Sequence, residues 1–145
     1  MLKNKTALIT GASRGIGKAI AQQFANHDCF VGINYVTDKK SAENTLNSLK
    51  NKDNSGMLLP GDISNLHDVK QIVNQLVEQR KQIDILVHNA GIYIRHHFKD
   101  IKLNDWNTVI DVNLNATFYL TQEVLPFLKK GGRIIFISSQ LAFKG

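Results

Sequence analysis

The sequence has few of the residues that would mark a secreted, metal-binding or membrane protein. Its single cysteine, Cys29, excludes an internal disulfide, and no histidines and cysteines are grouped at the spacing of metal ligands. We therefore expect no metal site and interpret Cys29 as a small buried apolar residue rather than a nucleophile. The longest mainly apolar segment near the start, residues 6–10, is too short for the core of a signal peptide, and no run approaches a membrane span. These absences predict a cytoplasmic protein with no membrane partner.

Dense basic runs are also missing. The 145 residues carry 18 Lys and Arg against 12 Asp and Glu, a formal net charge of +6, but the basic residues are spread from Lys3 to Lys144. Nucleic-acid-binding surfaces gather their cations and interleave them with aromatic residues, so we expect no nucleic-acid partner. The apolar fraction of 43% and charged fraction of 21% are ordinary for a globular protein. The length predicts one domain over residues 1–145.

Short apolar runs alternate with helical patterns along the whole chain. Continuous apolar runs are typical of strands buried on both faces of a parallel sheet. A helix is expected after each of the first four runs, while residues 92–102 show no clear period and predict a loop or a short helix. The predicted strands lie at residues 7–9, 29–35, 57–59, 83–87 and 133–139.

The predicted helices place apolar residues three or four positions apart. In the first helix these residues are Ile16, Ala19, Ile20 and Phe24. Ser41 and Ser64 stand where they would cap the second and third helices. The last helix, from about residue 104, is apolar on more than one face, which predicts cover from the sheet and from something else, such as another subunit. Pro126 is expected to kink this helix, and Gly131-Gly132 to end it.

This alternation predicts a doubly wound α/β fold, a Rossmann-like parallel sheet between two helical layers with strand order 3-2-1-4-5. In such sheets ligands bind beyond the carboxyl ends of the strands, close to the point where the strand order reverses. The residues that follow the five strands should therefore share one crevice. They are residues 10–17, 34–37, 62–63, 89–91 and 138–139.

A glycine-rich stretch, Thr10-Gly11-Ala12-Ser13-Arg14-Gly15-Ile16-Gly17, joins the first strand to the first helix. Glycines let the backbone approach a ligand closely, and the amino end of a helix attracts anions. The stretch thus predicts a phosphate-binding turn, with a plain connector as the alternative. Its position between a strand and a helix favours phosphate binding.

Several short motifs occur in a characteristic order, and together they resemble the short-chain dehydrogenase/reductase (SDR) family. The glycine stretch matches that family's Thr-Gly-x-x-x-Gly-x-Gly motif. Within the family the chain is similar to the 3-oxoacyl-(acyl carrier protein) reductases. The remaining matches are Asp62, Asn89-Ala90-Gly91, Asn113 and Ser138-Ser139.

The resemblance implies a binding role for each cofactor motif. The glycine stretch would hold a pyrophosphate through Thr10, Gly11, Ser13, Arg14, Gly15, Ile16 and Gly17. Asp62 with Ile63 would lie against the adenine, and Asn89, Ala90 and Gly91 would line the ribose side. His88 stands where the family commonly has a first Asn, a departure that leaves the Asn-Ala-Gly core intact.

The choice of cofactor follows from charge. NAD-selective sites place a carboxylate at the end of the second strand, where it would repel a 2′-phosphate. Tyr35 stands at that position here. Arg14 can offer a guanidinium to the phosphate, and Lys39 and Lys40 are close enough in sequence to help. We therefore expect NADP(H) rather than NAD(H).

The catalytic set implied by the resemblance is incomplete. In the resembled family the full set transfers a hydride to or from a carbonyl or alcohol carbon. A Ser and a Tyr contact the substrate oxygen, a Lys follows the Tyr by four residues, and an Asn relays protons. Ser139 matches the Ser, with Ser138 as the alternative, and Asn113 matches the Asn. The only Tyr-x-x-x-Lys spacing joins Tyr35 to Lys39, after the second strand.

We therefore expect residues 1–145 to be the N-terminal portion of a reductase, truncated before its proton donor and inactive by itself. The apolar strand at residues 133–139 would otherwise form an uncovered sheet edge. The resemblance implies a small carbonyl or alcohol substrate, with acyl thioesters among the candidates, and a homo-oligomer at full length. A non-catalytic nucleotide-binding or interaction module is the alternative function.

Overall fold

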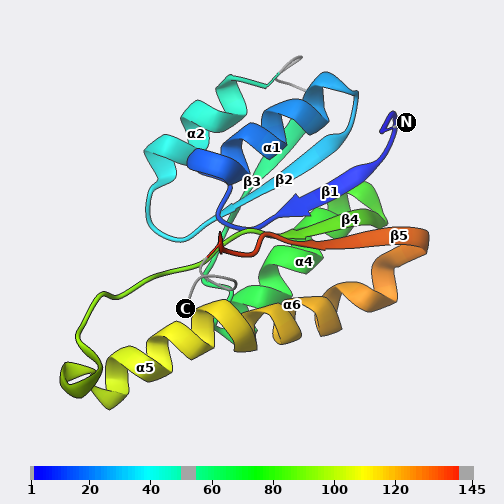
Figure 1. The fold of residues 1–145 in the computed structure, drawn as a ribbon. Coiled ribbons are helices and arrows are strands. Elements are labelled where there is room, and N and C mark those ends of the chain that lie inside the picture. Colours follow the sequence, from blue (N-terminus) through cyan, green and yellow to red (C-terminus); the bar gives the residue numbers. More distant parts are fainter. Residues whose placement is uncertain (1, 50–54, 141–145) are drawn as a thin grey trace.

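The computed structural model describes residues 2–49 and 55–140, and its centre is a five-stranded parallel sheet (Figure 1). The strand order is β3-β2-β1-β4-β5, which confirms the predicted order. Residues 51–55 are all polar, which predicts a loop after the second helix, and this loop lies almost wholly outside the described residues. The strands are β1 (Thr6–Ile9), β2 (Phe30–Tyr35), β3 (Gly56–Pro60), β4 (Ile83–His88) and β5 (Leu128–Phe136).

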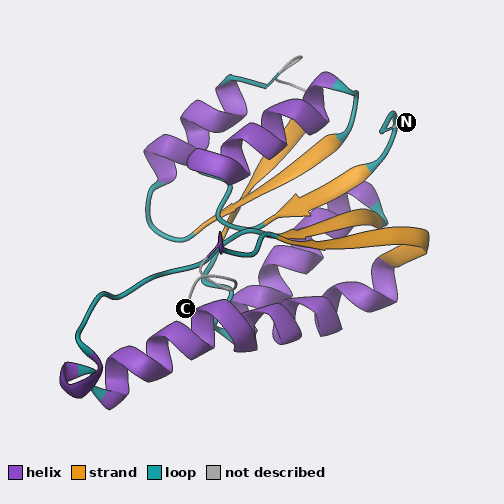
Figure 2. Cartoon of the chain, in the orientation of Figure 1, coloured by secondary structure: helices purple, strands orange, loops and turns teal. Residues whose placement is uncertain are grey.

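Helices cover both faces of the sheet, as the predicted three-layer architecture requires (Figures 1 and 2). Helices α1 (Gly15–Asn26) and α2 (Lys39–Asn47) lie on one face. Helix α4 (Leu66–Arg80) lies on the other face, beside a long helical segment. That segment consists of α5 (Leu103–Ile110), a π-helical turn (Asp111–Asn115), α6 (Ala116–Val124) and a 3-10 turn (Leu125–Phe127).

The central strands are buried along their whole length. Every residue of β1, β2 and β4 is buried, because helices cover both faces of these strands. Cys29 is also buried, which confirms its interpretation as a small buried residue, and desolvation raises the pKa of its thiol to about 12. The strands thus form a rigid platform whose carboxyl ends carry the loops of the site.

The face that α1 turns to the sheet differs from the predicted one. Its buried residues are Gly17, Ala21 and Ala25, whereas Ile16 is 61% exposed and Ala19 is exposed. Ile20 and Phe24 are partly buried at the edge of the core. Small side chains let the helix approach the sheet closely, so the larger apolar residues lie at the margin of the contact.

The predicted caps at Ser41 and Ser64 were wrong, the first by three residues and the second by one. Asp38 caps α2, and its carboxylate accepts a hydrogen bond from the backbone N–H of Ser41 at 3.0 Å. Asn65 caps α4, since its side-chain oxygen accepts from the N–H groups of His67 and Asp68. The Ser64 hydroxyl donates to the Asp62 carboxylate at 2.7 Å. Both helices therefore begin with an Asp or Asn cap, which accepts hydrogen bonds from the first turn.

The long helical segment ends earlier than predicted. Pro126 lies in the 3-10 turn Leu125–Phe127, so it helps to end the helix instead of kinking it. The Gly131-Gly132 pair falls inside β5, near an irregularity in the pairing of β5 with β4. Strand β5 ends at Phe136, so Ser138 and Ser139 follow the strand rather than belong to it.

Residues 92–102 form a loop with one short 3-10 turn, Phe98–Asp100, as predicted, and this loop extends away from the sheet (Figure 1). The long helical segment leaves several apolar side chains exposed. They are Leu103, Trp106, Leu114, Phe118 and Leu125. Within residues 2–49 and 55–140, no helix is long and apolar enough to span a membrane.

Candidate functional site

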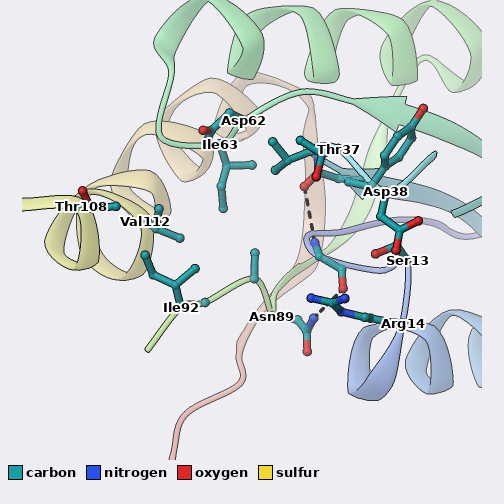
Figure 3. A pocket seen from close by; sticks show the side chains of 16 residues that line it. Ser13, Arg14, Thr37, Asp38, Asp62, Ile63, Asn89, Ile92, Thr108 and Val112 are labelled. Carbon is teal, nitrogen blue, oxygen red and sulfur yellow. Dashed lines mark hydrogen bonds between the residues drawn. The ribbon is translucent and has the colours of Figure 1, made fainter. Parts of the chain in front are cut away.

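A cleft of about 540 Å³ opens at the carboxyl ends of the strands, where the sequence places its motifs (Figure 3). Ser13, Arg14, Thr37 and Asp38 lie on one side of this cleft, and Ile92, Thr108 and Val112 lie on the other. Nine predicted cofactor residues line it. They are Gly11, Ser13, Arg14, Tyr35, Asp62, Ile63, Asn89, Ala90 and Gly91.

Glycine is required at different positions of the turn for different structural reasons. Gly11 and Gly15 adopt left-handed backbone angles, with φ of 61° and 57°, which side chains rarely tolerate. A Cβ on Gly15 would meet nothing within 4 Å, so the backbone there is open to a ligand. A Cβ on Gly17 would lie 2.6 Å from both the Asn89 amide nitrogen and the Gly11 carbonyl oxygen. Gly17 is thus required by packing and Gly15 by backbone conformation.

The amino end of α1 is suited to an anion. Its cap residue, Arg14, has extended backbone and makes no side-chain capping bond, and the first turn contains no acidic residue. The backbone N–H groups of a first helical turn need acceptors, and the helix dipole favours negative charge there. The predicted residues Gly15, Ile16 and Gly17 form this turn, although the cleft wall itself includes only their neighbours Ser13 and Arg14.

Thr10 and Asn89 connect the glycine turn to the end of β4. Thr10 is fully buried, and its hydroxyl oxygen accepts hydrogen bonds from the backbone N–H groups of Asn89 and Ala90, both at 3.0 Å. In return the Asn89 amide donates to the carbonyls of Thr10 at 2.9 Å and Gly11 at 3.1 Å. Both amide hydrogens of Asn89 are therefore used to hold the turn, and only its oxygen remains for a ligand.

Asn34 supports the turn from β2, a role that the sequence did not indicate. Its side-chain oxygen accepts from the Gly11 N–H at 3.4 Å, and its amide donates to the carbonyls of Leu59 and Gly61. Its backbone carbonyl accepts from the Ala12 N–H at 2.9 Å. A polar residue in an otherwise apolar strand was the available signal. Asn34 thus ties β1, β2 and β3 together beneath the cleft.

The charges on the β2 side come from Arg14 and Asp38. Tyr35 is buried and lines the cleft at the strand end, where no acid stands, but the carboxylate of Asp38 lies three residues further along the same wall. Hydrogen bonds from Ser41 lower the pKa of Asp38 below its usual value, and the nearby guanidinium of Arg14 lowers it further. The sequence did not single out Asp38, because this residue lies beyond the end of β2, directly before α2.

Asp62 and Ile63 lie between the two walls, after β3 (Figure 3). The Asp62 carboxylate accepts from the Ser64 N–H at 2.9 Å as well as from the Ser64 hydroxyl. The Asp62 N–H donates to Asp68 at 2.8 Å. Ile63 is 3% exposed, so it presents a small apolar surface to the cleft.

The opposite wall belongs to the long helical segment and to the loop after β4. Asn113 lies in the π-helical turn and exchanges two hydrogen bonds with the backbone of Ile92, each 2.9 Å long. This pair brings Ile92 beside Val112 and Thr108, three cleft residues that the sequence did not single out. π-Helical turns are rare and frequently occur at functional sites.

His88 occupies the end of β4, directly before Asn89. It is buried, its ring stacks on Phe136 at 4.8 Å, and its Nε2 lies 2.9 Å from the Thr121 hydroxyl. Desolvation lowers its pKa to about 4, so the ring is neutral near neutral pH. Within the part of the chain that the structure describes, its Nδ1 is the one buried side-chain nitrogen or oxygen without a hydrogen-bond partner.

The predicted serines follow the last strand. Ile137 continues the pairing of β5 with β4 by donating its N–H to the carbonyl of His88 at 2.8 Å. Ser138 and Ser139 come next; both are exposed, and neither lines the cleft. Among residues 2–49 and 55–140, no group of three His, Cys, Asp or Glu residues is arranged to hold a metal ion.

Comparisons with known proteins agree with this geometry. The profile of the family described as short chain dehydrogenase matches residues 5–145. A 3-oxoacyl-[acyl-carrier-protein] reductase FabG of Staphylococcus epidermidis is 35% identical over 144 residues, which are 98% of this chain and 59% of the relative. The chain thus spans about three fifths of that relative's length.

Two solved structures are similar over almost the whole chain. A short chain dehydrogenase from Burkholderia cenocepacia in complex with NADP has a TM-score of 0.93 and 32% identity, covering 99% of this chain and 58% of that one. A blue fluorescent protein from a metagenomic library in complex with NADPH has a TM-score of 0.92 and 32% identity, covering 99% and 59%.

Proposed function

The chain belongs to the short chain dehydrogenase family, and we propose that it is the cofactor-binding part of an oxidoreductase that transfers a hydride between NADP(H) and a carbonyl or alcohol substrate. The observation that carries this proposal is the cleft at the amino end of α1. Its glycine turn, its uncapped first helical turn and Arg14 would together form a site for phosphate groups. Residues 1–145 would form a single nucleotide-binding domain.

Each wall of the cleft has a proposed part in holding the cofactor. The backbone N–H groups of Gly15, Ile16 and Gly17 would bind the pyrophosphate, while Asp62 and Ile63 would contact the adenine. Asn89, Ala90 and Gly91 would line the ribose. The family's use of NAD(P) fits this arrangement, and both similar structures named above hold the phosphorylated form of the cofactor.

Charge supports NADP(H) as the preferred cofactor. Tyr35, rather than an acid, ends β2. Arg14 stands on the same wall with its guanidinium exposed, ready for a bidentate contact with a 2′-phosphate. Asp38 is the one acid on this wall among the described residues, and it already accepts hydrogen bonds from Ser41.

The bound nicotinamide would supply or accept the hydride. Ser139, or Ser138, would contact the substrate oxygen, and Asn113 would take part in passing protons while it orients Ile92 at the cleft. The family's Tyr-x-x-x-Lys pair would act as the proton donor. Because the FabG relative is longer than this chain, we propose that this pair belongs to a further part of the whole protein, and that residues 1–145 are inactive by themselves.

The substrate class comes from the relative at 35% identity, whose name specifies a 3-oxoacyl group on an acyl carrier protein. We propose an acyl thioester or another small carbonyl compound as the substrate. A homo-oligomer is the proposed assembly, because the long helical segment exposes Trp106, Leu114 and Phe118. A cytoplasmic location is part of the same proposal.

A non-catalytic nucleotide-binding module is the second candidate. The observation in its favour is that the one Tyr-x-x-x-Lys spacing, Tyr35 to Lys39, lies at the end of β2, where Tyr35 is 7% exposed and Lys39 begins α2. A nucleotide-binding module would use the same cleft without turnover.

Two measurements test these functions. Fluorescence titration with NADPH and NADH should show binding of both, with NADPH the tighter ligand, and equal or tighter NADH binding would refute the cofactor preference. Oxidation of NADPH by acetoacetyl thioesters should be undetectable for residues 1–145. It should appear when the protein is expressed from its whole coding sequence. Binding without turnover in both preparations would favour the second candidate.

A further inference from the structure

Thr45 of α2 makes a hydrogen bond to the glycine turn that its position in the sequence does not suggest. Its side chain is fully buried, and its hydroxyl donates to the carbonyl oxygen of Ser13 at 2.8 Å. The two residues are 32 positions apart in the chain. Ser13 lines the cleft beside Arg14, whereas Thr45 stands behind this wall and does not itself line the cleft.

Helix α2, which carries Thr45, is itself held by several hydrogen bonds. Asp38 caps its first turn, and the Ser48 hydroxyl donates to the Thr45 carbonyl at 2.6 Å. The Gln22 amide, from α1, donates to the Ser48 hydroxyl at 2.9 Å. Thr45 therefore joins the glycine turn to a scaffold that includes both helices on this face of the sheet.

The segment that Thr45 holds lies between two glycines, Gly11 and Gly15. Gly11 and Gly15 adopt left-handed angles, and Gly15 has open space where a Cβ would stand. Between them, Ala12 is held through its N–H by the carbonyl of Asn34. Arg14 is exposed and makes no side-chain capping bond. The Thr45 bond thus holds the peptide unit from which Arg14 projects.

We propose that Thr45 is a positioning residue, which fixes Ser13 and Arg14 for the 2′-phosphate and so sets the selectivity for NADP(H) over NAD(H). This inference rests on the proposed function. It adds that selectivity depends on a buried hydroxyl on α2 as well as on the charge in the cleft. Loss of that hydroxyl leaves the charge of Arg14 unchanged but lets the residue move away from the phosphate.

A purely structural role for Thr45 predicts a different result. A buried hydroxyl that only satisfies a carbonyl would change the stability of the fold, and binding of both dinucleotides would weaken by the same factor or not at all. Positioning of Arg14 instead predicts that the ratio of the two dissociation constants changes. The ratio therefore separates the two roles.

The test uses Thr45→Val, which has nearly the same shape, and Thr45→Ser, which retains the hydroxyl. Dissociation constants of NADPH and NADH are measured on the protein as its whole gene encodes it. For Thr45→Val we expect the dissociation constant of NADPH to rise about five- to tenfold, which corresponds to the loss of one hydrogen bond. The dissociation constant of NADH should rise by less than about twofold. Thr45→Ser should retain both affinities within about twofold.

A control removes a threonine hydroxyl that also donates to a backbone carbonyl, but through a solvent-exposed bond away from the cleft. The Thr117 hydroxyl on α6 donates to the Leu114 carbonyl at 2.7 Å, so Thr117→Val should leave both affinities unchanged. Should Thr45→Val not fold, Thr45→Ala removes the hydroxyl with a better helix former and gives the same comparison. In an Arg14→Gln background, removal of the Thr45 hydroxyl should change the ratio no further.

The outcomes distinguish this inference from the function on which it rests. Wild-type protein that binds neither dinucleotide would overturn both. Suppose that the wild type binds NADPH tightly and that Thr45→Val and Thr45→Ala leave the ratio of the NADPH to the NADH dissociation constant unchanged. That result would overturn the role of Thr45 alone. A ratio of the NADPH to the NADH dissociation constant that rises in Thr45→Val and stays at the wild-type value in Thr45→Ser would support both.

Discussion

Asn113 and Ile92 hold each other by a reciprocal pair of hydrogen bonds. The Ile92 N–H donates to the Asn113 side-chain oxygen and the Asn113 amide donates to the Ile92 carbonyl, each at 2.9 Å. Gly91 permits this approach, since a Cβ there would lie 3.3 Å from the Asn113 oxygen. The π-helical turn of the long helical segment is thereby joined to the loop that forms one wall of the cleft.

Replacement of Asn113 by Ala should therefore loosen this wall. We expect a loss of about 1 kcal/mol in the free energy of unfolding, since the bonds are exposed to solvent, and faster hydrogen exchange at the Ile92 amide. Urea unfolding and hydrogen exchange measure the two effects. Asn115→Ala is the control, because the Asn115 amide donates to the Asp111 carboxylate within the same turn. Unchanged exchange at Ile92 in Asn113→Ala would contradict the coupling.

The glycines of the turn should respond differently to alanine. Gly17→Ala forces a Cβ against the Asn89 amide and the Gly11 carbonyl, so we expect a loss of about 2 kcal/mol of stability and weaker NADPH binding. Gly15→Ala meets no atom but must adopt a φ of 57°, which costs about 1 kcal/mol. Thermal unfolding of both variants tests the order. A larger loss for Gly15→Ala would show that backbone conformation, rather than packing, dominates this turn.

Arg14→Gln should reduce binding of NADPH much more than binding of NADH. A charge-assisted hydrogen bond contributes about 1.5–3 kcal/mol, so the NADPH dissociation constant should rise roughly ten- to hundredfold. Lys70→Gln, on α4, makes the same change of charge away from the cleft and serves as the control. Equal weakening of both cofactors in Arg14→Gln would assign this residue to the pyrophosphate instead.

The stability of the fold should depend on pH through His88. Burial lowers the pKa of this histidine to about 4 in the folded protein, against an ordinary value of 6.5. Between these two values the unfolded chain binds a proton that the folded chain does not. Stability is therefore highest above about pH 6.5, falls as the pH decreases toward 4, and loses about 2 kcal/mol between pH 7 and pH 5.

Urea unfolding at pH 7 and pH 5 measures this loss. His88→Leu should remove most of the difference between the two pH values, although it also removes the contact with Thr121. His67→Leu, at an exposed position on α4, should retain the difference. A wild-type protein that is equally stable at both pH values would contradict a neutral, buried His88.

The sequence alone determined the family, the strand order and most of the residues that line the cleft. Buried parallel strands require continuous apolar runs, and a phosphate turn requires glycines at specific spacings, so both features are visible in the local sequence. The match of the family profile to residues 5–145 and the observed sheet order confirm the predicted family and the predicted strand order. The roles of Ser139 and Asn113 in catalysis stay predictions.

Only the tertiary structure decided which side chains support the cleft from behind. The caps at Asp38 and Asn65 depend on how the chain enters each helix, which the helical period does not specify. The bond from Thr45 to Ser13 and the pair between Asn113 and Ile92 join residues 32 and 21 positions apart. Such contacts arise when elements pack against one another. Hydrogen-bonding side chains do not recur at a regular spacing, so the sequence does not indicate their partners.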